Sequence, residues 1–258
     1  MEAPGAADGV ARRRTREPAL SEPTPGLGAL TVATVADRLA AVHDRIERAG
    51  ARSGSVTVVA VTKGLGREAI DAAVGAGLWD IGENYAQEML SKLSAAPPGA
   101  RWHFLGQPQS NKLARLAPHV HLWHGLDTEE HALALAQRRP SAPVLVQVRT
   151  AGPPGRHGAS AADVPALVGS AAAAGLDVRG LMAVGPRPAT ATEVSRCFWE
   201  VARLAASLEL SELSMGMSAD FDLAVAEGAT IVRLGTALFG PRPAAVGVVT
   251  GEAKLGCY

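Results

Sequence analysis

The sequence predicts a single-domain parallel (β/α)8 barrel, the TIM-barrel fold. Eight strand-length segments recur between Ser55 and Leu234, each separated from the next by a stretch long enough for a helix. Several are apolar along their whole length, as expected for strands buried on both faces. Eight such units in about 230 residues favour a closed barrel over an open doubly wound sheet.

Before the first strand, two segments differ sharply in character. Residues 1–28 are rich in Pro, Gly, Ala and Glu, carry a cluster of arginines and show no apolar period, so we expect a disordered, solvated tail. Over 35–51, apolar residues recur at helical spacing from Val35 to Ala49, which predicts an amphipathic helix packed on the barrel. We expect the barrel domain to span 29–245 and a C-terminal tail to span 246–258.

The strands and helices then alternate. We predict strands at 56–62, 79–82, 101–105, 120–124, 143–148, 178–183, 211–214 and 230–234. We predict helices near 67–76, 84–94, 110–117, 128–138, 162–174, 191–208 and 219–227.

Composition narrows the function. The 258 residues are 47% hydrophobic and carry 25 basic and 25 acidic residues, so we expect neither nucleic acid nor a membrane as a partner. No apolar run approaches the length of a membrane span and no signal-peptide core is visible, which favours a cytoplasmic protein. Cys197 and Cys257 lack metal-ligand or disulfide spacing, so we expect free thiols and no metal.

Polar residues and glycines gather at the C-terminal ends of the predicted strands, where (β/α)8 proteins carry their function. Lys63 ends the apolar run 55–62 and is one of only four lysines in the chain. Lysine, unlike arginine, can form an imine with an aldehyde. The alternative is a lysine that simply extends from a strand end into solvent.

Two later segments supply groups that suit a phosphate. Ser218 precedes an apolar helix with Asp220 in its first turn, so we expect it to cap that helix and face the barrel mouth; a cap without a ligand is the alternative. Gly235 and Thr236 follow the last strand and offer a close backbone approach and a hydroxyl. With Lys63, these residues predict a pyridoxal phosphate site.

Long motifs, in order from about residue 35 to 242, resemble one known family. They are Val61-Thr62-Lys63, Gly82-Glu83-Asn84-Tyr85-Ala86-Gln87-Glu88, Trp102-His103-Phe104-Leu105-Gly106-Gln107 with Gln109-Ser110-Asn111-Lys112, Gly180-Leu181-Met182-Ala183, Leu213-Ser214-Met215-Gly216-Met217-Ser218-Ala219-Asp220-Phe221 and Val232-Arg233-Leu234-Gly235-Thr236-Ala237-Leu238-Phe239-Gly240. The chain is similar to the pyridoxal phosphate homeostasis protein family, also called YggS or PROSC. The resemblance implies a fold-type III barrel like the N-terminal domain of alanine racemase.

The resemblance also implies roles for individual residues. Lys63 would be the Schiff-base lysine, Asn84 would face the cofactor, and Ser218, Gly235 and Thr236 would hold its phosphate. Arg233 would face the pyridine nitrogen and keep it unprotonated, which weakens the ring as an electron sink; an ion pair with a neighbouring strand is the alternative. Met217, with Met182 and Met215, would pack around an aromatic ligand.

The chain departs from the family pattern at two places. Gly64-Leu65-Gly66 stands where many members have Thr and often a second lysine, so that basic group is absent. Arg149 and Gly155-Arg156-His157-Gly158 replace an Asn and a Ser-Lys-Ser-Gly-like loop. Because arginine holds phosphate but does not accept an aldehyde, a second lysine-linked site is not expected. His103 is expected to be a hydrogen-bonded core residue.

Three functions are compatible with such a barrel. The resemblance implies a non-catalytic carrier, monomeric, that buffers pyridoxal phosphate and passes it to apoenzymes. A pyridoxal phosphate-dependent amino-acid racemase is the alternative, but it needs a second proton carrier, and the chain has only Tyr85 and Tyr258 and ends soon after the last strand. A phosphosugar-metabolising barrel with an imine on Lys63 is the third, and the position of that lysine on the first strand counts against it.

Overall fold

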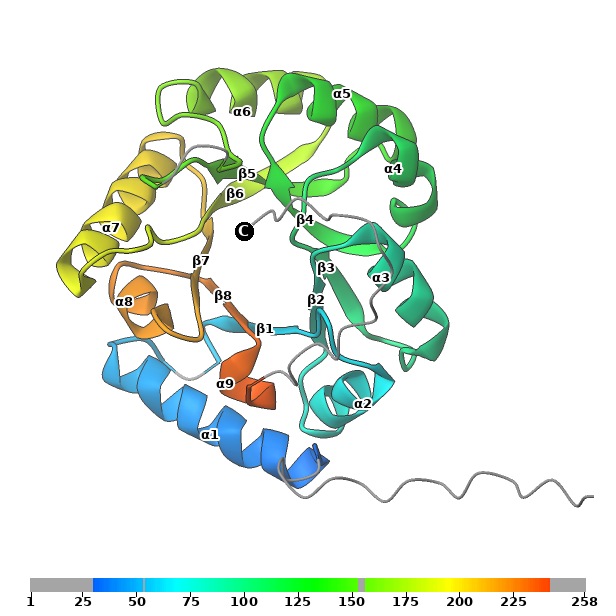
Figure 1. Ribbon diagram of the computed structural model, residues 1–258. Coiled ribbons are helices and arrows are strands. Elements are labelled where there is room, and N and C mark those ends of the chain that lie inside the picture. Colours follow the sequence, from blue (N-terminus) through cyan, green and yellow to red (C-terminus); the bar gives the residue numbers. More distant parts are fainter. Residues whose placement is uncertain (1–29, 53, 153–155, 242–258) are drawn as a thin grey trace, which may run out of the picture.

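The chain forms a closed barrel of eight parallel strands. The computed structural model describes residues 30–52, 54–152 and 156–241; within them each strand pairs with the next, and the eighth pairs with the first. Figure 1 looks along the barrel axis and shows the helices as a ring outside the strands. The predicted (β/α)8 architecture is confirmed.

The strands are β1 (Thr57–Val61), β2 (Asp80–Glu83), β3 (Arg101–Phe104), β4 (Val120–Leu126), β5 (Pro143–Val148), β6 (Asp177–Ala183), β7 (Glu212–Met217) and β8 (Ile231–Leu234). The helices are α1 (Val32–Arg48), α2 (Arg67–Gly75), α3 (Ala86–Lys92), α4 (Ser110–Leu116), α5 (Glu129–Arg138), α6 (Val164–Ala173), α7 (Ala191–Ser207), α8 (Phe221–Ala226) and α9 (Thr236–Phe239), and a 3-10 turn η1 (Leu93–Ala95) follows α3.

Every predicted strand and helix is present, with ends that differ from the prediction by at most three residues. The short helix α9 was not predicted, because four residues are too few to show a helical period. The predicted tails at 1–28 and 246–258 lie outside the described residues.

The core has two layers, as the alternation of side chains along each strand requires. Outward-facing strand residues pack with the helices, and Trp123, Phe198 and Phe221 are among the largest side chains buried there. A small apolar cluster fills part of the barrel interior; it consists of Val59, Leu122, Leu145, Met182 and Ile231. Several other strand positions are buried and polar: Asp80, His103, His124, Ser214 and Arg233.

Helix α1 covers the outside of the seam between β8 and β1, against α2, α8 and α9 (Figure 1). Its N-cap is Thr31, whose hydroxyl accepts a hydrogen bond from the Thr34 amide, and it buries Val35, Val42 and Ile46. Arg38 donates from Nη1 to the Leu238 carbonyl at 3.1 Å, which ties α1 to α9. The first helix thus helps to close the barrel.

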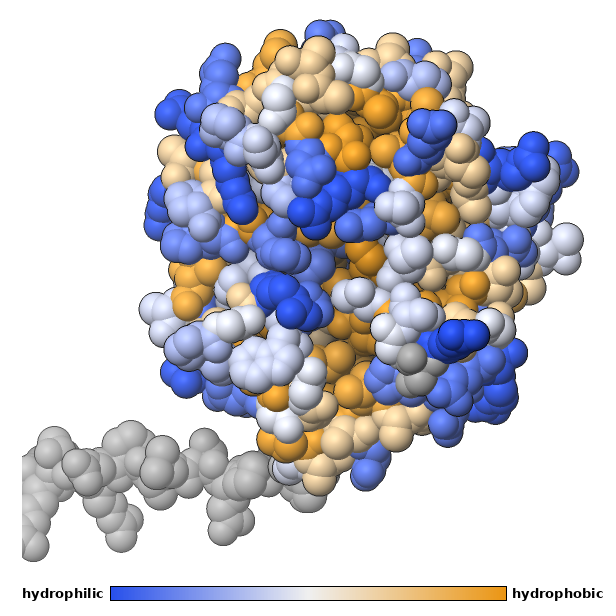
Figure 2. Space-filling model, turned by 180° about the vertical axis from the view of Figure 1, so that it is seen from behind, coloured by the Kyte–Doolittle hydropathy of each residue, from blue (hydrophilic) through white to orange (hydrophobic). Residues whose placement is uncertain are grey.

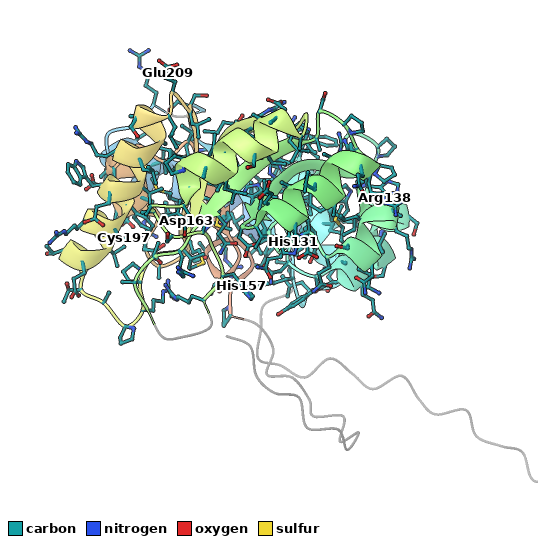
Figure 3. The ribbon with its side chains drawn as sticks, turned by 90° about the horizontal axis from the view of Figure 1, so that it is seen from above. His131, Arg138, His157, Asp163, Cys197 and Glu209 are labelled. Atoms are coloured by element: carbon teal, nitrogen blue, oxygen red, sulfur yellow. The ribbon has the colours of Figure 1, made fainter. Side chains whose placement is uncertain are left out.

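The two ends of the barrel can be distinguished in Figure 3, where Glu209, just before β7, and His157, in the loop after β5, lie at opposite ends. Figure 2 shows the molecule from behind the view of Figure 1, and on that face polar and apolar residues are mixed. Among the helices of the described ranges, none combines the length and apolar character needed to cross a membrane.

Candidate functional site

The seven predicted cofactor residues lie near the ends of four strands, or directly after them, and these strands are consecutive around the barrel in the order β7, β8, β1, β2. The register places Arg233 beside Met217 on one side and beside Val59 on the other. The seven residues are Lys63, Asn84, Met217, Ser218, Arg233, Gly235 and Thr236. One sector of the barrel mouth therefore gathers residues that are up to 173 positions apart, from 63 to 236, in the sequence.

Lys63 is half-buried, two residues beyond the end of β1, and both of its neighbours in the chain are fixed. The Thr62 hydroxyl donates to Glu83 Oε1 at 2.6 Å, and the Thr62 carbonyl accepts from Lys92 Nζ at 2.8 Å. The Gly64 amide donates to Glu88 Oε1 at 2.5 Å. The backbone that carries Lys63 is thus anchored on each side to charged residues of β2 and α3.

Lys92 lies at the centre of this anchor. Its side chain is 9% exposed and pairs with Glu83 at 2.6 Å and with Glu88 at 2.8 Å. Burial raises the pKa of Glu83, and hydrogen bonds from Lys92 and Thr62 act in the opposite direction. Sequence reasoning missed this cluster, although the i,i+4 spacing of Glu88 and Lys92 on one helix was visible.

Gly64 adopts a φ of +72°, in the left-handed region that other residues enter at a cost. The glycine that replaces the family's threonine after Lys63 therefore has a backbone role here: it allows the chain to turn directly after the lysine, toward the Glu88 carboxylate.

The prediction that Ser218 caps the next helix is wrong. Asp220 is the N-cap of α8, and its Oδ1 accepts from the Met217 amide at 2.6 Å, which closes a turn and delays the helix to Phe221. The Ser218 hydroxyl instead accepts from the amides of Gly235, at 3.3 Å, and Ala237, at 3.0 Å. It therefore joins the loop after β7 to the backbone after β8.

Gly235 and Thr236 border open space. A Cβ added at Gly235 would make only ordinary contacts with Val61, the closest at 3.4 Å, so the protein itself does not demand glycine there. A cavity of about 260 Å³ contains Ser218 and the exposed Thr236 and is lined on its other side by α1. Two guanidinium groups that were not predicted, those of Arg38 and Arg45, line it as well.

Arg233 is 6% exposed and points into the barrel. Its Nη1 donates to the carbonyl and the hydroxyl of Ser214, each at 2.6 Å, and its Nη2 donates to the Ala183 carbonyl at 2.8 Å. These partners are not carboxylates, so the alternative of a strand-to-strand ion pair is wrong. Desolvation lowers the pKa of Arg233 to about 10, which leaves it a cation at neutral pH.

The remaining predicted residues lie as follows. Asn84 is half-buried directly after β2, and Met217 is half-buried at the end of β7. His103 is 2% exposed and bonded to Asp80 and His124, which confirms it as a hydrogen-bonded core residue. Tyr85, the candidate second proton carrier of a racemase, is 58% exposed directly before α3.

A larger cavity, of about 590 Å³, lies between the loops after β3, β4 and β5 and helix α6. Arg149, His157 and Asp163 line it, and Figure 3 shows the last two at this end of the barrel. It contains none of the seven predicted residues, so volume alone does not mark the cofactor site. Across the described ranges, no three potential metal ligands cluster, and Cys197 is a half-buried free thiol.

The residues of the β7–β2 sector fit pyridoxal phosphate. Lys63 supplies an amine, Ser218 and Thr236 supply hydroxyls, and Gly235 leaves room for a ligand. The hydrogen bonds of Arg233 use three of its five N–H groups, which leaves donors for a ring nitrogen.

Comparison with known proteins agrees with this fit. The chain matches the family described as alanine racemase, N-terminal domain, over residues 38–243. It is 42% identical to the pyridoxal phosphate homeostasis protein of Deinococcus radiodurans over 205 residues, 78% of this chain and 97% of the relative.

Solved structures of PipY from Synechococcus elongatus are similar as well. The form without PLP has 36% identity and a TM-score of 0.72, and the form with PLP bound has 35% and 0.68; each match covers 80% of this chain and 100% of PipY. Because both the family match and the relatives span most of the chain, it belongs to the alanine racemase N-terminal domain family and, within it, to the pyridoxal phosphate homeostasis proteins.

Proposed function

We propose that this protein binds pyridoxal 5'-phosphate as a Schiff base on Lys63 and acts in intracellular homeostasis of the cofactor, buffering it and delivering it to apoenzymes. The observation that carries the proposal is the convergence of Lys63, Arg233 and the Ser218–Thr236 group on three consecutive strands, β7, β8 and β1. The relatives' name and the PipY structure with PLP bound support it.

Each residue has a part in holding the cofactor. The cofactor supplies an aldehyde that reacts reversibly with an amine. Lys63 provides that amine; Ser218, Gly235 and Thr236 hold the phosphate; Arg233 donates to the ring nitrogen. Asn84 and Met217 line the cofactor from the neighbouring strands.

A carrier without turnover suits these residues better than a racemase does. A guanidinium donor leaves the ring nitrogen unprotonated, which limits stabilisation of a carbanion. Tyr85 is the one tyrosine within the described ranges, and its exposed side chain is not held as a second proton carrier. A closed barrel has no free sheet edge, so we propose a monomer.

The test is to incubate the purified protein with pyridoxal phosphate, record its visible spectrum, reduce it with borohydride and locate the modified lysine by mass spectrometry. We expect the label on Lys63. Lys63→Ala should lose the visible band and keep only weak, phosphate-anchored binding, whereas Lys112→Ala, which removes another lysine near the barrel mouth, should retain the label. An equal band in Lys63→Ala would overturn the proposal, and racemisation of added D- or L-amino acids would favour the enzyme.

A further inference from the structure

A continuous chain of hydrogen bonds crosses the interior of the barrel. His103 contacts Asp80 Oδ1 through Nε2 at 3.0 Å and His124 Nε2 through Nδ1 at 2.9 Å. His124 Nδ1 lies 2.9 Å from Ser214 Oγ, and Arg233 Nη1 lies 2.6 Å from the same oxygen. These five residues, here called the interior chain, connect β2, β3 and β4 with β7 and β8 across the barrel.

The interior chain is deeply buried, with no member more than 8% exposed. Polar side chains in such a place cost free energy unless they are fully bonded, and apolar residues fill the neighbouring interior positions without that cost. The interior chain satisfies both ring nitrogens of His103 and both of His124. Both histidine rings are therefore fully hydrogen-bonded, and the interior chain ends at Arg233, which keeps unused N–H donors.

For neutral histidine rings, the two ends of the interior chain fix the direction of the hydrogen bonds between them. Arg233 can only donate. Asp80 can only accept, because hydrogen bonds from Arg101 and His103 outweigh the effect of burial and hold its pKa well below the ordinary value.

From these ends the protons can be placed. With both histidines neutral, His103 donates from Nε2 to Asp80 and accepts at Nδ1 from the Nε2–H of His124. His124 then accepts at Nδ1 from the Ser214 hydroxyl, whose oxygen accepts from Arg233. Burial lowers the pKa of His124 well below its usual value and keeps the ring neutral.

We propose that the interior chain positions the guanidinium of Arg233 for the ring nitrogen of pyridoxal phosphate, so that Asp80, at the start of β2, helps to retain a cofactor at the barrel mouth. The inference rests on the proposed function. Asp80, His103, His124 and Ser214 act as positioning residues, since each touches the cofactor only through the next.

The geometry at Arg233 explains how the positioning works. Ser214 holds Nη1 through two oxygens and Ala183 holds Nη2 through one. The hydroxyl of Ser214 stays oriented as an acceptor toward Arg233 only while its own proton is directed to His124. Breaking the interior chain anywhere frees that hydroxyl to rotate and loosens the guanidinium.

The direction of the interior chain can be tested without any cofactor. Nitrogen-15 NMR of the cofactor-free protein should show both His103 and His124 as neutral rings with the proton on Nε2. Ser214→Ala removes the donor to His124 Nδ1 and should shift the His124 nitrogen signals. A proton on Nδ1 of either ring in the wild-type protein would overturn the proposed direction.

The effect on the cofactor is tested by its dissociation rate and by the pH profile of its visible absorbance. Asp80→Ala and Ser214→Ala should each release pyridoxal phosphate about threefold to tenfold faster, as expected when about one hydrogen bond is lost or loosened at Arg233, and should shift the pH profile. Asp177→Ala is the matched control, because Asp177 also starts a strand and pairs with an arginine but is exposed and outside the interior chain. If Asp80→Ala fails to fold, Ser214→Ala alone decides.

The positioning role would be overturned if Ser214→Ala had the same cofactor dissociation rate and the same pH profile of visible absorbance as the control. Absence of label on Lys63 in the wild-type protein would overturn the proposed function instead, and the spectra of the cofactor-free protein would still test the interior chain.

Discussion

Replacing Lys92 with Met should destabilise the protein strongly, although Lys92 lies outside the predicted cofactor residues. Lys92 is 9% exposed, and its partner Glu83 is fully buried. Met matches the length of the lysine stem, so the main loss is the ammonium and the three hydrogen bonds that it donates. Removing one partner of a buried ion pair leaves a desolvated charge and costs about 3–5 kcal/mol.

The free energy of unfolding that Lys92→Met loses should be smaller at low pH than at high pH. Burial already raises the pKa of Glu83 above its ordinary value of 4.5, and loss of Lys92 raises it further. A carboxyl whose pKa is higher in the folded than in the unfolded protein reduces stability as the pH rises through its folded value. Lys92→Met should therefore lose less free energy of unfolding at about pH 5 than at about pH 8.

Urea unfolding at both pH values provides the measurement. Lys92→Met combined with Glu83→Gln should be more stable than Lys92→Met alone, because the double variant has no unpaired buried carboxylate. Arg67→Met, which breaks the exposed pair of Arg67 with Asp71, is the control and should cost about 0.5 kcal/mol or less. A loss below about 1 kcal/mol, or an equal loss at the two pH values, would refute the account of the cluster.

Three further perturbations test other parts of the structure. Gly64→Ala should cost about 1–2 kcal/mol in urea unfolding because of its φ of +72°, whereas Gly169→Ala, inside α6 with open space around it, should not destabilise. The lowered pKa of His124 means that the unfolded protein binds its proton first, so stability should fall below about pH 6.5 by up to about 1.4 kcal/mol per pH unit, and His124→Asn should flatten that slope. Ser218→Ala with Thr236→Ala should speed release of pyridoxal phosphate and leave the circular dichroism spectrum unchanged; an unchanged release rate would place the phosphate elsewhere.

The fold was readable from the sequence because local pattern and burial agree in most elements. The apolar run before Lys63 became β1, and the spacing of Val35, Val42 and Ile46 became the buried face of α1. The exception, α9, is too short to carry a periodic signal.

The site was readable only in part, for a physical reason. Lys63 and Arg233 were predicted at strand ends, and the order of the strands brings them together. Ser218 was predicted as the N-cap in place of Asp220. The Asp220 side chain accepts from the Met217 amide and so extends the turn, which moves the start of α8 to Phe221. The contact of His124 with Ser214 joins residues 90 positions apart across the barrel, and no local pattern reports such a contact.

Pairing of β1 with β8 has a consequence for folding. Val59 lies opposite Arg233, so the first strand to be synthesised completes its hydrogen bonding only with the last. Such non-local pairing must pay its loop-closure entropy before it gains stability, and it forms slowly. Lys63 follows β1 and Arg233 lies in β8, so the predicted cofactor site is complete only when these two strands pair and the barrel closes. Binding of pyridoxal phosphate would then report barrel closure, and a partly folded chain without residues 231–239 would not bind it.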